Sequence, residues 1–113
     1  MITNASDLLG KEVTVTIDRP LGSAHPKFPQ SIYPINYGYI PNTLSPIDNE
    51  EIDAYVIGPM SALETFTGKV IAIINRTDDE EKLVVAEQPM TAGDIEDAIH
   101  FQEKFYKHTL TIL

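Results

Sequence analysis

The sequence predicts one β-rich domain in which about five strands are followed by a single covering helix. Apolar and polar residues alternate in several short segments before residue 87, as in strands with one buried face. One of these segments ends in a continuous apolar run, which indicates burial on both faces. After residue 90 the apolar residues recur with the period of a helix. With 113 residues the chain has the size of one domain, and we expect residues 1–113 to form it.

Residues 13–18 form the first predicted strand, because valine and isoleucine alternate there with threonine and aspartate. Arg19-Pro20 ends it, since proline cannot donate to the hydrogen-bond ladder of a sheet. Residues 21–34 then contain Gly22 and three prolines, which predicts a long, stiff loop without helix or strand. Loops of this length in compact domains tend to be functional, and an ordered surface crossing is the structural alternative.

Four further strands are predicted between this loop and the helix. The aromatic, β-prone stretch 33–40 favours a strand, which the turn signal Pro41-Asn42 ends. Residues 52–57 alternate again, and residues 67–74 carry the continuous apolar run. Residues 82–86 form a short fifth strand.

The helix begins after Thr91, a residue type that commonly caps helix N-termini, with Asp94 at the spacing of a capping box. A mostly apolar stripe then runs from Ile95 to Tyr106 at intervals of three and four residues. Its expected role is to cover an open face of the sheet.

Composition excludes several classes of function. Seventeen acidic against eight basic residues give a net charge of −9, which argues against a nucleic-acid partner. An acidic surface by itself is typical of solubility. The chain has no cysteine, so disulfides, thiolate nucleophiles and cysteine-ligated zinc are excluded. The three histidines show no metal-ligand spacing and are interpreted as structural or exposed.

No membrane or secretory segment is expected. Residues 1–10 lack the basic and then apolar pattern of a signal peptide. The longest purely apolar run, Val70–Ile74, is too short to cross a bilayer. We therefore expect a cytoplasmic protein without a membrane partner.

Two acidic clusters, residues 48–53 and 78–82, are the candidate functional features. Taken singly, each cluster is more typical of a solvated turn than of a functional site. If the flanking strands are neighbours, both clusters lie at sheet ends and converge, and two carboxylates about 5 Å apart repel by roughly 3 kcal/mol at an effective dielectric near 20. Such a group needs protons or cations. Oxygen-only ligands without histidine or cysteine suit Mg²⁺, with Mn²⁺ as the alternative.

Cationic and phenolic donors are available for an anionic substrate. Lys27 lies in the proline-rich loop, Lys82 ends the second acidic cluster, and Tyr33, Tyr37 and Tyr39 crowd one predicted strand. The structural alternatives are that the lysine beside the acids makes a surface ion pair and that the tyrosines are core residues with a solvated tip.

The string Tyr-Pro-Ile-Asn-Tyr-Gly-Tyr-Ile at residues 33–40, then Thr43-Leu44 and the acids of 48–53, resembles the soluble inorganic pyrophosphatase family. The similarity continues into the last helix and covers roughly residues 11–107. It implies a five-stranded, OB-like barrel with helical cover. It also implies Mg²⁺-dependent hydrolysis of pyrophosphate or a related diphosphate through a metal-activated water.

The resemblance also assigns roles to single residues. Metal ligands fall on Asp18, Asp48, Glu50, Asp53, Asp78 and Glu80. Glu50 falls on the position that accepts a proton from the attacking water, and Tyr37 is the second catalytic candidate. Donors to the phosphates fall on Lys27, Tyr33, Lys82 and Tyr106, the last only if one residue is inserted in the helix.

This chain also departs from the family pattern. Glu50 and Glu80 replace aspartates, and Glu51 stands where proline is usual. The loop before Tyr33 is short and lacks the family's phosphate-binding arginine. A ligand displaced by about 1 Å can reduce a rate by about 10²-fold, so weak activity or a different substrate is expected. Family members commonly assemble, which makes a homo-oligomer an expectation as well.

Three hypotheses follow from these observations. The first is a metal-dependent pyrophosphatase or related diphosphate hydrolase. The second is a weakly active or inactive module of the same fold that binds metal and a phosphate ligand. The third is a structural or assembly protein whose acidic turns are only solvated.

Overall fold

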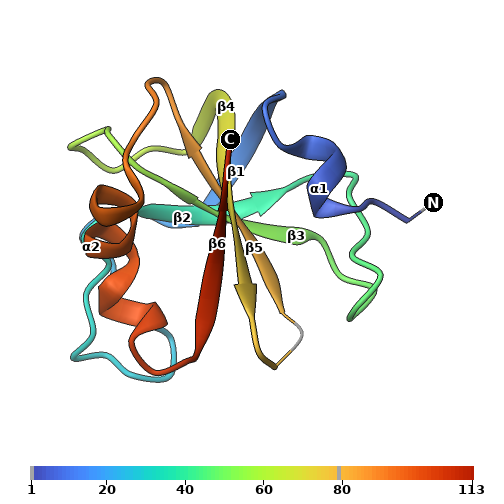
Figure 1. Cartoon of the computed structure of the whole chain (residues 1–113). Coiled ribbons are helices and arrows are strands. Elements are labelled where there is room, and N and C mark those ends of the chain that lie inside the picture. Colours follow the sequence, from blue (N-terminus) through green and yellow to red (C-terminus); the bar gives the residue numbers. More distant parts are fainter. Residues whose placement is uncertain (1, 79) are drawn as a thin grey trace.

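The alternating segments form a closed β-barrel with one helix packed on its outside (Figure 1). The computed structural model describes residues 2–78 and 80–113. In chain order its elements are α1 (Ala5–Leu8), β1 (Glu12–Arg19), β2 (Asn36–Ile40), β3 (Ile52–Val56), β4 (Thr65–Arg76), β5 (Glu81–Ala86), α2 (Ala92–Glu103) and β6 (His108–Ile112).

The barrel is closed by strands that are distant in sequence. The hydrogen-bonded order is β1-β2-β3-β5-β4-β6, and β1 also pairs with β4. The ring therefore contains β1 to β5, and β6 extends it beyond β4. All of these pairs are antiparallel except β3 with β5. The predicted five-stranded barrel with a helix near its C-terminal end is confirmed.

Several element boundaries differ from the predictions, and one strand was not predicted. β2 begins at Asn36 rather than residue 33, because the chain around Pro34 still belongs to the preceding loop. α2 ends at Glu103 and not at Tyr106, since the chain turns at Lys104 to enter β6. Phe105 and Tyr106 are consequently exposed. β6 itself was not predicted, because it is a short edge strand with little apolar content.

Apolar side chains fill the interior of the barrel. The alternation of each strand sends one set of residues inward, and together with Ala5 of α1 they form the first core. Its fully buried members include Val15, Val56, Val70 and Leu83. The helix does not contribute to this interior core; the face of the sheet that it covers is the outer one.

A second core lies between the outside of the barrel and α2. Tyr37, Tyr55 and Val84 face outward there and pack with Ile95 and Ile99 of the helix. Thr91 caps α2 as predicted, because its side chain accepts a hydrogen bond from the backbone N–H of Asp94. None of the helices in the described part of the chain is long and apolar enough to cross a membrane.

The β1–β2 pairing contains a bulge that matters for the site. Ile17 is opposite Gly38 and Arg19 is opposite Tyr37, so one extra residue, Asp18, interrupts the ladder. Bulges bend a strand and redirect its side chains. Ile17 points into the barrel, whereas Asp18 is exposed and Arg19 lies beside the outward-facing Tyr37.

Replacing Gly38 with alanine is expected to destroy the barrel. A Cβ at this buried position would lie 1.9 Å from the carbonyl oxygen of Thr16 and 2.8 Å from the Cα of Ile17. Both are backbone atoms that cannot move aside, so we expect a loss of about 3 kcal/mol or more in the free energy of unfolding. Urea unfolding followed by circular dichroism measures it.

Gly93→Ala is the matched control. The nearest atom to a Cβ there is 4.0 Å away, and the position is helical, so alanine is expected to stabilise the fold by about 0.5 kcal/mol. A Gly38→Ala protein as stable as the parent would contradict the close approach of β1 and β2.

Candidate active site

The candidate site lies on the outside of the barrel at one end of β2, β3 and β5. The strand register aligns Tyr39, Asp53 and Lys82 in one row and Tyr37, Tyr55 and Val84 in the next. Residues two apart on a strand share a face. Tyr37, Asp53 and Lys82 are thereby brought together from three strands.

Tyr37 and Asp53 are directly bonded. The buried Tyr37 hydroxyl donates to Oδ2 of Asp53 at 2.9 Å. Burial raises the pKa of Asp53, and the nearby Glu80 and Asp18 raise it further, against the lowering effects of Tyr37 and Lys82. Burial and the negative charge of Asp53 raise the pKa of Tyr37 as well. Tyr37 is therefore a neutral donor to a carboxylate that is difficult to ionise.

Lys82 is buried rather than paired on the surface. Only 3% of the residue is exposed, and its Nζ lies 5.0 and 5.4 Å from the ring centroids of Tyr37 and Tyr55. Burial and the charge of Arg76 lower its pKa, against the opposing effect of nearby carboxylates. The alternative of a surface ion pair is wrong for this residue.

The charge that faces Lys82 comes from the helix. Glu103 of α2 is fully buried, and its Oε2 lies 3.6 Å from Nζ of Lys82. Arg76 holds the same carboxylate with two hydrogen bonds of 2.7 Å, from Nε to Oε1 and from Nη2 to Oε2. The Tyr55 hydroxyl donates to Oε2 at 2.6 Å. Although burial opposes ionisation, these donors and Lys82 lower the pKa of Glu103.

A chain of hydrogen bonds runs from Glu103 across the second core. Gln102 donates to the Tyr55 hydroxyl at 2.7 Å and accepts from the Tyr33 hydroxyl at 2.8 Å. Tyr33 in turn accepts a bond of 2.6 Å from Nη1 of Arg19. Sequence reasoning missed Arg19, Gln102 and Glu103. The available signal was the spacing of Glu103, which continues the four-residue steps of Ile95 and Ile99 and so predicts burial.

The two acidic clusters meet at one small pocket. It is lined by five acids together with Ser45, Ile47 and Ile52; the acids are Asp48, Glu51, Asp53, Glu80 and Glu81. This matches the expected convergence, although Glu51 and Glu81 were not among the predicted ligands. Within residues 2–78 and 80–113, no three acidic or histidine side chains lie close enough together to hold one metal ion.

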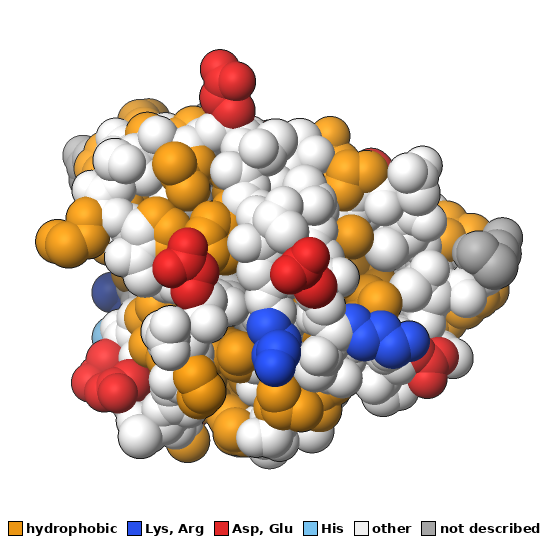
Figure 2. Space-filling model, turned by 90° about the horizontal axis from the view of Figure 1, so that it is seen from above, with side chains coloured by type: hydrophobic (Ala, Val, Ile, Leu, Met, Phe, Trp, Pro, Cys, Tyr) orange, Lys and Arg blue, Asp and Glu red, His pale blue; other side chains and the backbone are white. Residues whose placement is uncertain are grey.

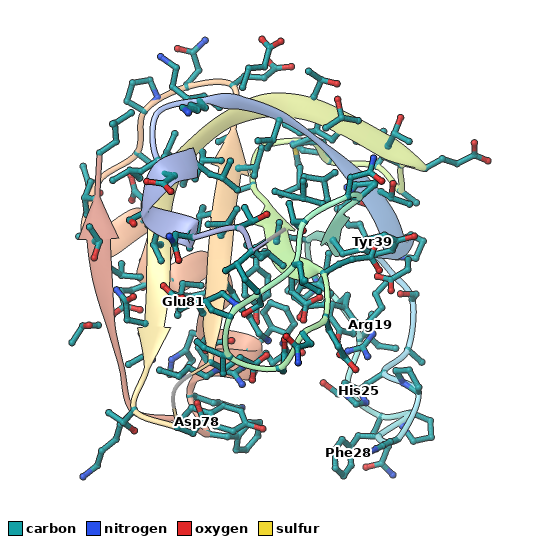
Figure 3. The ribbon with its side chains drawn as sticks, turned by 90° about the vertical axis from the view of Figure 1, so that its right-hand side faces the viewer. Arg19, His25, Phe28, Tyr39, Asp78 and Glu81 are labelled. Carbon is teal, nitrogen blue, oxygen red and sulfur yellow. The ribbon has the colours of Figure 1, made fainter. Side chains whose placement is uncertain are left out.

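Three other predicted ligands lie outside this pocket. Glu50 is exposed, and its backbone N–H donates to Oδ1 of Asp48. Asp78 is exposed at the β4–β5 turn, where Figure 3 shows it apart from Arg19. Asp18 is exposed on the bulge of β1, close enough to Asp53 to influence its pKa.

The predicted phosphate donors are distributed differently. Tyr33 is buried and takes part in the hydrogen-bond chain, and Lys27 is exposed on the loop. Tyr106 lies outside the lining of the acid pocket. Its ring instead covers the guanidinium of Arg76, whose Cζ lies 3.8 Å from the ring centroid.

A second groove is larger but chemically unsuited to anions. It has a volume of about 700 Å³, is mainly apolar, and is lined by the β3–β4 connection, the start of β4 and the residues after β5. These segments lie at the top of Figure 1, on the side that Figure 2 shows, where hydrophobic side chains gather between scattered charged ones. Among the described residues that line it, only Glu87 is charged, so the groove offers no cation to an anionic ligand.

Glu103→Gln is expected to destabilise the protein strongly. The substitution keeps the shape of the side chain but leaves the buried Lys82 without its paired carboxylate and Arg76 with Glu80 alone, which costs roughly 3 kcal/mol or more. For a domain of this size we expect the melting temperature to fall by more than about 10 °C. Thermal unfolding by circular dichroism measures it.

Asp97→Asn, which removes an exposed acid from the same helix, is the control. Its free energy of unfolding should stay within about 0.5 kcal/mol of that of the parent. If Glu103→Gln had the same melting temperature as this control, Glu103 would not be the residue that holds the helix on the barrel.

Comparison with known proteins agrees with this architecture. Residues 11–110 match the sequence model of the family described as inorganic pyrophosphatase. No curated protein sequence matches the chain.

Solved inorganic pyrophosphatases share the fold. The one from Ehrlichia chaffeensis has a TM-score of 0.67 at 15% identity, over 98% of this chain and 89% of that one. The enzyme from Coxiella burnetii has a TM-score of 0.64 at 17% identity, over 89% of this chain and 84% of that one. The enzyme from Thermus thermophilus has a TM-score of 0.60 at 17% identity, over 98% of this chain and 84% of that one. Because the family model covers nearly the whole described barrel and helix, the chain belongs to the inorganic pyrophosphatase family of hydrolases.

Proposed function

We propose that this protein hydrolyses inorganic pyrophosphate or a closely related diphosphate. The observation that supports this most is the bond from Tyr37 to Asp53 beside the buried Lys82, at the edge of a pocket where two acidic clusters meet. Membership of the pyrophosphatase family makes a diphosphate the substrate class to test first. A cytoplasmic location and a homo-oligomeric state stay predictions.

The donor chemistry fits a hard divalent cation. The pocket offers carboxylates and hydroxyl or backbone oxygens, with neither histidine nor cysteine in its lining, which suits Mg²⁺ or Mn²⁺. Of the predicted ligands, Asp48, Asp53 and Glu80 line it, whereas Asp18, Glu50 and Asp78 lie outside its lining. When bound, such an ion would activate water and compensate charge on the phosphates.

The chain's own residues orient the pocket. Tyr37 fixes Asp53 through its hydroxyl, so one carboxylate oxygen is committed and the other stays available to the pocket. Lys82 supplies positive charge behind them, and Glu103 holds it in place. Glu50, the predicted base, is exposed next to Glu51 of the pocket lining and would accept the proton of the attacking water. Phosphoryl transfer depends mainly on such positioning and charge compensation.

Phosphate release from pyrophosphate in Mg²⁺ buffer tests the proposal, with Asp53→Asn as the comparison. We expect the parent to release phosphate and the variant to lose at least about 10²-fold in rate, because it removes the best-positioned carboxylate. In metal-free buffer above neutral pH, Asp53→Asn should have a higher melting temperature than the parent protein. The raised pKa of Asp53 means that its ionised form destabilises the fold there.

This gain in stability should disappear as the pH falls below the ordinary aspartate value of about 3.9, where Asp53 is neutral in both folded and unfolded chains. Higher stability with lost activity separates a functional carboxylate from a structural one. Equal phosphate release by the parent and Asp53→Asn would refute the proposed role.

A binding module without turnover is the second candidate function. It is favoured by the exposure of Asp48, Glu50 and Asp78, and by the absence, among the described residues, of three acids gathered for one ion. Calorimetry decides between the two. Mg²⁺-dependent binding of pyrophosphate without phosphate release supports the module. A melting temperature unchanged by Mg²⁺ and pyrophosphate would instead support the structural hypothesis, because a ligand of the native state stabilises it.

A further inference from the structure

The two arginines of the chain, Arg19 and Arg76, have very different surroundings. Arg76 is fully engaged, because it donates twice to Glu103 and once to Glu80 at 2.7 Å each, and Tyr106 covers its face. It has little capacity left for a ligand. Any arginine contact with an anionic substrate must therefore come from Arg19.

The bulge in β1 places Arg19 at the candidate site. In an uninterrupted ladder Asp18 would be opposite Tyr37, but the extra residue brings Arg19 to that register position. The Cζ of Arg19 lies 5.5 Å from the ring centroid of Tyr37 and 5.8 Å from that of Tyr33. Aromatic faces attract a guanidinium at such distances, so the two rings hold the group on the outside of the barrel.

The guanidinium of Arg19 is oriented but not neutralised. Its one recorded side-chain hydrogen bond joins Nη1 to the Tyr33 hydroxyl, which is fixed in turn by donating to Gln102. No carboxylate among residues 2–78 and 80–113 lies within 4.0 Å of it. Arginine has five N–H donors, and most of those on Arg19 lack a protein acceptor in the described part of the chain. The side chain is only half-buried, so a ligand from solvent can reach it.

Further cationic and N–H donor groups surround Arg19. The His25 ring stacks on Tyr33, with centroids 6.1 Å apart and planes inclined by 10°. Its Nδ1 accepts the backbone N–H of Lys27, which leaves Nε2–H as a donor in the neutral ring. Partial burial and the charges of Arg19, Lys27 and Lys82 lower the pKa of His25. Figure 3 shows Arg19 and His25 on the same side of the site.

We propose that Arg19 binds a phosphoryl group of the diphosphate substrate, with His25 and Lys27 beside it. A planar guanidinium held at one edge by Tyr33 can present its free edge to two phosphate oxygens at once. The acids line the other part of the site, where Asp53 bonds to Tyr37. This inference rests on the proposed function and adds to it the group that recognises the substrate.

Two measurements on Arg19→Ala and Arg19→Lys test the proposal. The first is the dissociation constant of methylenediphosphonate in Mg²⁺ buffer, a diphosphate analogue whose P–C–P link cannot be hydrolysed. The second is KM and kcat for pyrophosphate. We expect Arg19→Ala to raise the dissociation constant and KM by about 10- to 100-fold, as for loss of a charged hydrogen bond. Arg19→Lys should be intermediate, because an ammonium keeps the charge but not the paired geometry.

Lys69→Ala is the control for loss of one positive charge. Lys69 is exposed on β4 and pairs with Glu12, which lies seven residues before Arg19 on β1 and thus about 23 Å from it along that strand. Removal of Lys69 should therefore change neither constant. If Arg19→Ala melts far below the parent, Arg19→Lys decides the question, with an expected three- to tenfold loss in affinity.

The outcomes separate this inference from the proposed function. If the parent binds the analogue and hydrolyses pyrophosphate, and the Arg19 variants bind the analogue as tightly as Lys69→Ala does, the role of Arg19 is overturned. The proposed function is then unaffected. A parent that neither binds the analogue nor releases phosphate overturns both.

Discussion

The ion pair between Glu103 and Arg76 is the constraint on which the arrangement of the molecule depends. A carboxylate without solvent contact is costly unless it is paired and hydrogen-bonded. Here the helix supplies the carboxylate, and β4 and β3 supply Arg76 and the Tyr55 hydroxyl. These hydrogen bonds can all form only in one placement of α2. They therefore fix the rotation of the helix about its axis and its position along the barrel surface. Apolar packing alone would define neither as sharply.

The same ion pair shapes the electrostatics of the candidate site. Glu103 attracts Lys82 as well as Arg76, and Arg76 reaches on to Glu80 of the acid pocket. Two buried cations thus face Glu103, Glu80 and Asp53, which leaves an excess of negative charge. Burial raises the pKa of Asp53, and the charges of Glu80 and Asp18 raise it further against the lowering effects of Tyr37 and Lys82. Under the proposed function a cation bound in the pocket would offset this negative charge, so stability and function are expected to oppose each other there.

Most of the fold was predictable because its signals are local. The strands around residues 52–57, 67–74 and 82–86 and the cap at Thr91 follow from periodicity and capping chemistry alone. β6 carries no such signal, since its place beside β4 depends on the chain turning after the helix. The site was predictable only in part. Resemblance suggested Asp53, whereas its bond to Tyr37 depends on strand register. The burial of charged residues depends on which partners meet in three dimensions.

Aromatic rings explain why the free guanidinium of Arg19 does not simply pair with a neighbouring acid. Asp18 is adjacent in sequence and Asp53 is close enough for the two carboxylates to influence each other's environment. Contact with the faces of Tyr33 and Tyr37 and the bond to the Tyr33 hydroxyl compete with such pairing, because they hold the group in one orientation. Tyr37 at the same time commits its own hydroxyl to Asp53. The tyrosines thereby keep the Arg19 guanidinium apart from the carboxylate of Asp53, a separation that the proposed binding of a metal-bound diphosphate would use.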